Sequence, residues 1–124
     1  MSSNKLFQNA IYQMKDAIDR TIGVIDESAV VIACSDIGKV GEAKENIGFD
    51  YMMSADTFTV NGYTYRPFGN GARSEYAVFV QGDDEMARKY TMILSVSMNS
   101  IKQYYDEKYD RNNFIKNVIL DNIL

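Results

Sequence analysis

The side chains best suited to ligand recognition in this sequence belong to two arginines, Arg66 and Arg73. A guanidinium group binds a carboxylate through two parallel hydrogen bonds, so a ligand with two carboxylates needs two such anchors or their equivalents. Thr57 and Thr64 share the face of Arg66 in a predicted hairpin, where their hydroxyls could bind hydroxyls of a ligand. The commoner use of such residues is an ordinary solvated strand face.

Five further candidates lie in or beside the least regular part of the chain. Ser35 and Asp36 follow a predicted strand, where they could hold ligand hydroxyls or, more commonly, cap the next turn. Tyr51, Met52 and Met53 could line a pocket wall, although filling the core is the commoner role of such residues. The candidate ligand-binding residues are therefore Arg66, Arg73, Ser35, Asp36, Thr57, Thr64 and Tyr51.

Several residue types that common chemistry requires are absent or scarce. The sequence has no histidine, which is the commonest general base and metal ligand, and Cys34 is its single cysteine. This excludes an ordinary zinc site, and neither of the glycine-rich phosphate-binding motifs occurs. No basic residue adjoins Cys34, so we interpret it as a buried structural thiol. We therefore expect no catalytic residue, no metal and no cofactor, and the protein is predicted not to be an enzyme.

The overall composition predicts one globular domain. The 124 residues are 46% hydrophobic, which is enough to build a core without disulfides. The net charge of −4 argues against a nucleic-acid-binding face within this chain. No apolar run approaches the roughly 18 residues of a membrane span, and the N-terminus lacks the layout of a signal peptide. We expect a cytoplasmic protein with no membrane contact.

The first half of the chain is predicted to form one helix and two strands. Apolar residues at helical spacing predict a helix over 4–19. Two short β-rich runs, 22–25 and 30–34, are joined by turn-like residues and read as a hairpin. Both runs are apolar on both faces, which is typical of strands that lie inside a sheet or are covered on both sides. Residues 35–56 are irregular, and long irregular segments are often functional.

The strongest local signal is Asn61-Gly62 between two alternating runs over 57–66. This pair favours a type I′ hairpin, because that turn needs positive φ at both central residues. The two-residue loop also sets the register, which gives one face the apolar side chains Phe58, Val60, Tyr63 and Tyr65. Pro67 is expected to end the second strand of this hairpin or to lie at an edge of it. A fifth strand follows over 75–81 and is apolar on both sides.

The C-terminal part is predicted to be helical. Asp83 or Asp84 caps a long helix that runs to about Lys108. Charged residues over 106–113 interrupt the apolar pattern, and Asp110 is predicted to cap a short last helix. No stop signal follows that helix, which suggests a longer chain. This order of elements predicts an α+β fold with a PAS-like or profilin-like five-stranded antiparallel sheet, the first and fifth strands central.

Four stretches of the chain carry a resemblance to a known family: 6–11, 24–26 with 30–35, 76–82 and 105–124. They resemble the N-terminal sensory domain of bacterial transcriptional regulators of the CdaR/PucR type, the sugar diacid recognition family, and in particular its clostridial members. The resemblance spans nearly the whole chain and is strongest at the C-terminus and weakest over 36–75.

The resemblance implies a cytoplasmic regulator in which a bound ligand adjusts a distal helix-turn-helix. Residues 1–108 are then a PAS-like sensory domain, and residues 109–124 are a helical linker toward a DNA-binding part that is not in this sequence. We expect a sugar diacid or similar small carboxylate as ligand, and a homodimer through helices 4–19 and 84–124. The alternative is a dimerisation or scaffold module without a small-molecule ligand.

Overall fold

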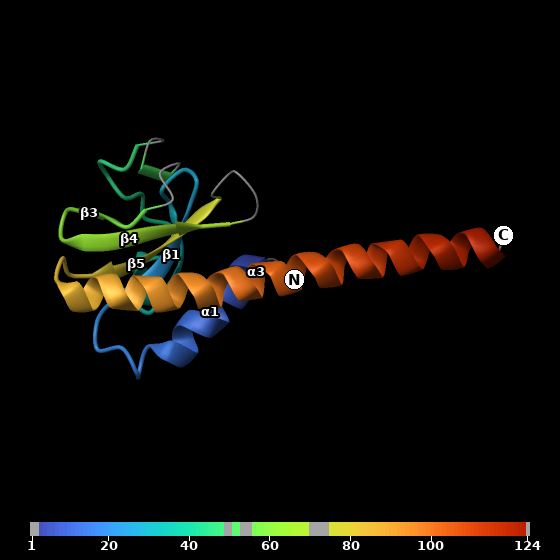
Figure 1. Cartoon of the computed structure of the whole chain (residues 1–124), viewed down its shortest axis with the longest axis horizontal. Coiled ribbons are helices and arrows are strands. Elements are labelled where there is room, and N and C mark those ends of the chain that lie inside the picture. The colour runs from blue at the N-terminus through green and yellow to red at the C-terminus, as the bar shows by residue number, and fades with distance from the viewer. Residues whose placement is uncertain (1–2, 49–50, 53–55, 70–74, 124) are drawn as a thin grey trace.

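A five-stranded antiparallel sheet forms the centre of the computed structural model, which describes residues 3–48, 51–52, 56–69 and 75–123 (Figure 1). The strands lie in the order β2-β1-β5-β4-β3. The sheet consists of β1 (Ile22–Asp26), β2 (Val31–Cys34), β3 (Phe58–Val60), β4 (Tyr63–Phe68) and β5 (Tyr76–Gln81). The predicted α+β class is confirmed, and so is the interior position of the first and fifth strands.

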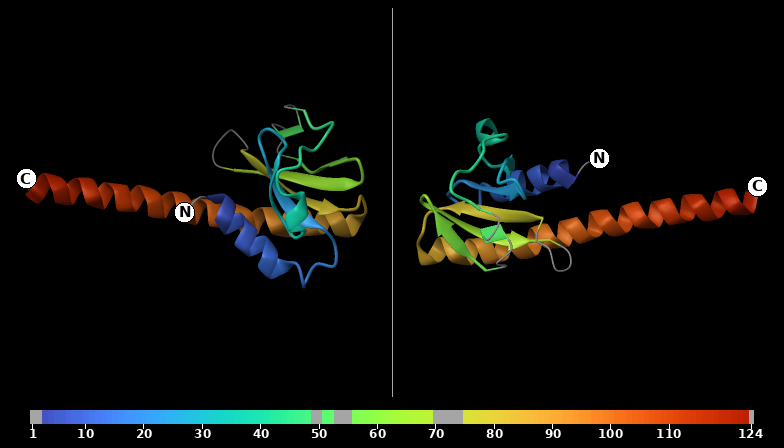
Figure 2. Two further views of the ribbon diagram at one scale, coloured as in Figure 1. Left: turned by 180° about the vertical axis from the view of Figure 1, so that it is seen from behind. Right: turned by 90° about the horizontal axis from the view of Figure 1, so that it is seen from above.

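Two helices, α1 (Ser3–Met14) and α3 (Glu85–Ile123), pack against the same face of this sheet. The short 3-10 helix η1 (Ile37–Lys39) lies in the irregular segment that follows β2. Figure 2 shows α3 running along the sheet and then continuing well beyond it. None of the helices in the described part of the chain is both long enough and apolar enough to cross a membrane.

The helix α1 ends five residues earlier than the predicted helix over 4–19. Its last turn is closed by hydrogen bonds from the amides of Ala17 and Ile18 to the Met14 carbonyl, after which the chain turns toward β1. Ile18 still packs in the core with 7% of its surface exposed. The helical spacing of the apolar residues therefore predicted correctly that Ile18 is buried, but it extended the helix into the turn that follows α1.

The Asn61-Gly62 hairpin forms as predicted. Both residues have positive φ, 51° and 81°, and Val60 pairs with Tyr63. Of the two alternatives for Pro67, the end of the strand is excluded and an edge position fits, because β4 continues through Phe68 and Pro67 pairs with Ala77 of β5. The neighbouring β3 begins only at Phe58, opposite Tyr65, so β4 has a single strand neighbour at Pro67. A residue without an N–H is tolerated at such an edge.

The predicted division between a long helix and a short last helix is also wrong. The helix α3 is continuous over 39 residues, and the boundary predicted at residue 109 falls inside it. Charged residues interrupt the apolar stripe there, but Asp, Glu, Lys and Arg are all compatible with a helix interior. No glycine or proline follows Gly82 in the sequence, so nothing in the backbone chemistry stops the helix.

Two hydrophobic clusters cover the two faces of the sheet. The first lies under α1 and α3 and is centred on Phe7, Ile11, Val24, Val78, Leu94 and Met98. The second lies on the opposite face, under the segment that follows β2, and contains Ile25, Val31, Cys34, Met52, Tyr65 and Phe79. Because β1 and β5 contribute to both clusters, their doubly apolar sequences are explained.

Candidate functional site

A hollow of about 250 Å³ lies where β4 meets the middle of α3. We call it the arginine hollow, because Arg66 is the charged residue among those that line it. The strand contributes Arg66 and the residues after it, and the helix contributes three residues spaced along one side. The lining consists of Arg66, Pro67, Phe68, Gly69, Ser95, Val96 and Asn99.

The guanidinium of Arg66 is held in place from the neighbouring strand. Its Nη1 donates a hydrogen bond to Thr57 Oγ1 over 3.0 Å, and the side chain is half-buried. This pair sits directly beyond the ladder in which Phe58 opposes Tyr65, as the predicted register requires. The bond uses one of the five N–H donors of the guanidinium. Thr57 therefore positions Arg66, and the predicted pairing of these two residues on one face is seen in the structure.

The helical wall of the arginine hollow carries two polar side chains four residues apart. Ser95 is buried, and its hydroxyl donates a hydrogen bond to the Met92 carbonyl over 2.8 Å. Asn99 has a buried Oδ1 atom with no hydrogen-bond partner among the described residues. Such an atom costs stability unless a ligand or water satisfies it. Sequence reasoning missed both residues, although polar positions at i and i+4 on the core side of a helix are a recognisable signal.

The arrangement can recognise a small molecule that carries both a carboxylate and a hydroxyl. A guanidinium binds the carboxylate, and the unpaired Asn99 Oδ1 accepts a hydrogen bond from the hydroxyl. The volume of about 250 Å³ is below the roughly 300–1,000 Å³ of pockets for drug-sized ligands, so it suits a smaller molecule. The described side chains that line this hollow offer hydrogen-bond donors and acceptors from Arg66, Ser95 and Asn99, which suits recognition of such a ligand.

One of the predicted binding residues, Thr64, offers no surface to a ligand. Thr64 is fully buried, and its hydroxyl donates a hydrogen bond to the Gly82 carbonyl over 2.8 Å. It faces the helix layer, because α3 covers the strand face that the sequence left open to solvent. Thr64 therefore joins β4 to the residue before α3 instead of meeting a ligand. Arg73 lies outside the described residues.

Ser35 and Asp36 lie in a separate hollow of about 370 Å³, together with Arg20 and Gln81. The Ser35 hydroxyl accepts a hydrogen bond from the Ile22 amide over 3.1 Å, and Asp36 accepts one from the Gly38 amide over 3.1 Å. Asp36 is thereby the N-cap of η1. The capping role, which was the commoner alternative, describes Asp36, whereas the Ser35 hydroxyl joins the end of β2 to the start of β1. The structure does not bring these two residues together with Arg66.

The opposite face of the sheet is filled by side chains. Tyr51 stacks on Phe58 with ring centroids 4.7 Å apart, and Met52 is buried in the second cluster. The Lys44 ammonium lies 3.9 Å from the centroid of the Tyr63 ring. Burial raises the pKa of the Cys34 thiol, which favours the unreactive protonated form, as predicted for a structural cysteine. Met53, also a candidate, lies outside the described residues.

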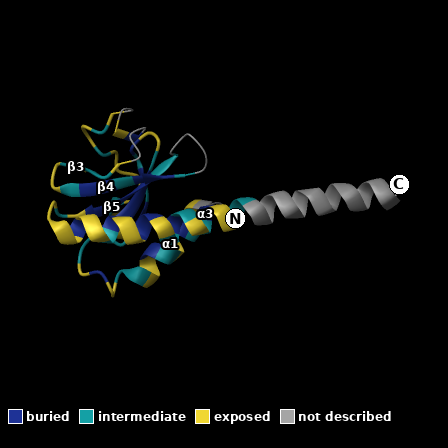
Figure 3. Ribbon diagram, viewed as in Figure 1, coloured by how far each residue is buried: buried dark blue, intermediate teal, exposed yellow. Residues whose placement is uncertain are grey.

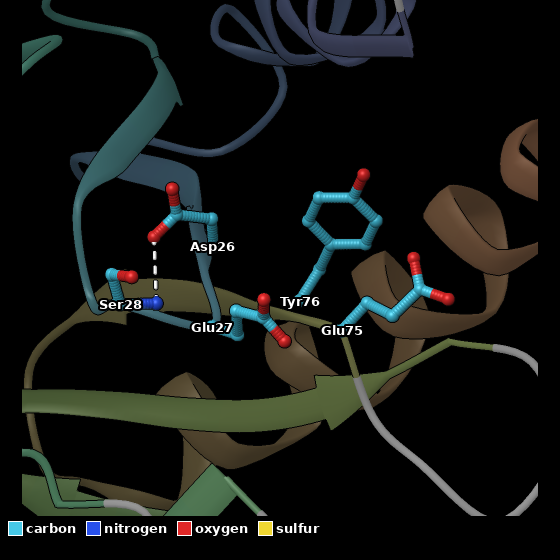
Figure 4. Close-up of a pocket in the computed structure, with 5 residues that line it drawn as sticks. All are labelled: Asp26, Glu27, Ser28, Glu75 and Tyr76. Atoms are coloured by element: carbon cyan, nitrogen blue, oxygen red, sulfur yellow. Dashed lines mark hydrogen bonds between the residues drawn. The ribbon is translucent and has the colours of Figure 1, made fainter.

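A third hollow, of about 400 Å³, is acidic (Figure 4). The Asp26 carboxylate turns back to the Ser28 amide, whose hydrogen bond to it is 2.9 Å long, and so stabilises the β1–β2 turn. The side chains of Glu27 and Glu75 flank Tyr76, which gives the hollow a negative charge that disfavours a carboxylate ligand. Within the described ranges, no group of three or more acidic or cysteine side chains could hold a metal ion.

The start of α3 is fixed by an ion pair across the sheet. Arg20 donates two hydrogen bonds to the Asp84 carboxylate, over 2.5 and 2.6 Å. Asp84 is also the N-cap of α3, as predicted, because its Oδ1 accepts a hydrogen bond from the Ala87 amide. The hydrogen bonds from Arg20 hold the pKa of Asp84 well below its usual range. The N-terminus of α3 is thereby tied to the connection between α1 and β1.

Asp84→Asn is expected to lower the urea midpoint at pH 7, with an effect that depends on pH. The folded-state pKa of Asp84 lies below its ordinary value of 3.8, so its contribution is present above that value and is lost as the pH falls further. The difference in urea midpoint between the wild type and Asp84→Asn should therefore become smaller below about pH 4. Asp83→Asn removes the same charge one residue away and serves as control. A difference in urea midpoint that stays constant from pH 7 to pH 3 would contradict a stabilising role of the ionised Asp84 carboxylate.

The comparisons with known proteins concern the fold. No protein-family model and no curated protein matches the sequence. A chain in the crystal structure of the E. coli DhaR(N)-DhaL complex is similar in structure, with a TM-score of 0.59 and 8% sequence identity. The match covers 95% of this chain and 54% of that chain, so the present chain spans about half of its length. The shared features are the antiparallel sheet, the N-terminal helix and the long C-terminal helix.

Proposed function

We propose that this chain is a non-catalytic, ligand-sensing input domain of a cytoplasmic bacterial transcriptional regulator. Its ligand is a small hydroxy-carboxylate of the sugar diacid class, bound in the arginine hollow. The observation that carries the proposal is that this hollow is shared between the sheet and α3, with Arg66 on one wall and Asn99 on the other. A ligand held there contacts both the fixed body of the domain and the helix that leaves it.

Signal output is expected to follow from the way α3 is held. Its start is tied down by Asp84 and Arg20, and its middle lines the arginine hollow. Farther along, Lys102 is 2.7 Å from Asp106 and 3.8 Å from Glu75, which precedes β5. If α3 can occupy two positions against β4, a ligand that binds one of them more tightly raises the population of that position. The size of this shift is set by the difference between the ligand's affinities for the two positions. The extended C-terminal part of α3 carries that shift away from the domain.

The regulatory setting is supported by two resemblances. The sequence resembles the sensory domains of CdaR/PucR-type regulators, and the fold is similar to that of a chain in the DhaR(N)-DhaL complex, which is an assembly of two proteins. A domain with one recognition hollow and one projecting helix suits such an assembly. DNA contact would be made only through a part outside this sequence, since the net charge of this chain is −4.

A second candidate function is a dimerisation module without a small ligand, and one observation favours it. The outward side of α3 exposes large apolar side chains, including Ile93 and Val96, with 59% and 68% of their surfaces accessible. Such a surface is typical of an interaction site. The two functions are compatible, and we propose a homodimeric sensor.

The ligand-sensing proposal is tested by thermal shift with a panel of tartrate, malate, glucarate and related hydroxy-dicarboxylates. A compound at 100 times its dissociation constant should stabilise the fold by about 2.7 kcal/mol. Arg66→Gln should weaken binding of that compound roughly 10- to 100-fold, because a hydrogen bond to a charged group contributes about 1.5–3 kcal/mol. Arg88→Gln, at an exposed position of α3, is the matched control. No shift with any compound contradicts the proposal, and so does full affinity in Arg66→Gln.

A further inference from the structure

The side of α3 that faces away from the sheet carries an apolar stripe. Figure 3 shows exposed residues along this side of the helix. Within the described part of the chain, no other helix or strand exposes so many large apolar side chains. The residues of the α3 stripe, with their exposed fractions, are Met86 47%, Met92 52%, Ile93 59%, Val96 68% and Tyr104 63%.

The spacing of these residues places them on one side of the helix surface, which they share with the exposed polar residues Lys89, Ser100 and Gln103. Met86 and Ile93 are seven residues apart, and Val96 follows Ile93 by three, which is the repeat of a helix-packing seam. Met92 lies four residues before Val96 and widens the strip. The opposite side of the helix packs on the sheet through fully buried Leu94 and Met98. The α3 stripe is therefore a second apolar face on a helix that already has one.

The length of α3 also calls for a partner. Its 39 residues correspond to about 58 Å, and Figure 1 shows its C-terminal part extending past the sheet. Helices in water owe most of their stability to the packing of an apolar face. The α3 stripe itself runs from Met86 to Tyr104, about 27 Å of helix, so a partner that lies along it makes contact over several turns.

The occupant that fits this stripe is a second copy of the same chain. A two-fold contact uses the same patch on both partners, so the patch must be complementary to itself. In a parallel pair each apolar residue meets its own counterpart. In an antiparallel pair centred between Ile93 and Val96, these two meet each other, and Met86 lies near Tyr104. The stripe is thus self-complementary in either direction. By contrast, the apolar side of α1 is used inside the domain, where Phe7 and Ile11 are fully buried.

We propose that a second copy packs along the α3 stripe, and that α1 takes no part in this contact. The predicted homodimer surface is thereby reduced to α3 alone. Val96 belongs both to the stripe and to the lining of the arginine hollow, so the partner helix lies at the rim of that hollow. On the basis of the proposed function, this adjacency couples ligand binding in the arginine hollow to dimerisation. A ligand that binds the dimer more tightly than the monomer strengthens the dimer by the same factor.

Light scattering after size exclusion, on the full chain without ligand, tests the contact. The wild type should elute with the mass of a dimer, and Ile93→Glu should give a folded monomer, with a dissociation constant raised at least about 100-fold by two buried unpaired carboxylates. The matched control is Ile37→Glu, which makes the same substitution at an equal exposure, 60% against 59%, away from α3. Circular dichroism confirms that both variants are folded.

A wild type that is monomeric at 100 μM overturns the proposal, and so does an Ile93→Glu variant that remains as dimeric as Ile37→Glu. These results do not depend on any ligand, so they separate this proposal from the ligand-sensing function. The coupling is measured by repeating the dissociation curve of the wild type with 10 mM tartrate and with 10 mM glucarate. A shift in dimer affinity with a binding compound is expected, and an unchanged curve with a compound that binds Arg66 contradicts the coupling.

Discussion

Replacing Gly23 with alanine is expected to lower the free energy of unfolding by about 3 kcal/mol, at the upper end of the usual cost of overpacking a core. Gly23 lies in β1 between two paired strands and is buried. A Cβ atom there would lie 2.4 Å from the Ala33 carbonyl oxygen and 2.5 Å from the Phe79 ring. The first obstacle is backbone and the second belongs to a fully buried ring, so neither can move without disturbing the sheet.

Urea unfolding followed by circular dichroism measures this loss, and Gly48→Ala is the matched control. An added Cβ at Gly48 meets nothing within 4 Å, so that variant should differ from the wild type by less than about 1 kcal/mol, in the stabilising direction. Equal effects of the two substitutions would show that backbone entropy, and not the close approach of Phe79 to β1, governs this position.

Phe7→Ala is expected to cost about 3–5 kcal/mol, because it leaves a cavity where α1 docks on the sheet. The Phe7 side chain is fully buried and makes edge-on contacts with Phe68 and Tyr76, at centroid distances of 5.6 and 5.1 Å. These rings belong to β4 and β5, and Phe68 also lines the arginine hollow, so one side chain joins the N-terminal helix to the sheet beside that hollow. Such a loss is a large share of the roughly 5–15 kcal/mol that stabilises a domain of this size.

The control for Phe7→Ala is Tyr12→Ala on the same helix. Tyr12 is 45% exposed, and the Lys15 ammonium lies 4.4 Å from the centroid of its ring, so its removal should cost at most about 1 kcal/mol. Phe7→Leu, which keeps part of the apolar volume, should fall between the two and remains measurable if Phe7→Ala does not fold. Similar small losses at both positions would mean that α1 is not integral to the core.

The strands and their order were predictable because their signals are local. Asn61-Gly62 encodes its turn, and the turn encodes the register that brings Thr57 to Arg66. The doubly apolar runs of β1 and β5 indicate interior strands. The break predicted near residue 109 is wrong because an interruption of the apolar stripe does not end a helix whose residues are all compatible with a helix interior. At Pro67 the strand continues because β3 begins only at Phe58, so no pairing with β3 requires an N–H there.

The candidate site was only half predictable. Arg66 stands out as a cation on a polar strand face, but the second wall of its hollow comes from Ser95 and Asn99, about thirty residues later in the chain. Their relevance depends on which face of α3 meets β4, and helical spacing alone does not determine that. Thr64 shows the opposite error. Its polar strand face was expected to be exposed to solvent, but in the structure this face is buried under α3.

Amide hydrogen exchange on the full chain is the most direct test of whether this domain binds a ligand and transmits that event through α3. The ligand is the hydroxy-dicarboxylate that gives the largest thermal shift. Binding should slow exchange at 66–69 and at 95–99, the two walls of the arginine hollow, and should change the exchange of α3 beyond Lys102 as well. Protection confined to the opposite face, around Tyr65 and Phe79, or no change anywhere in α3, would contradict the account.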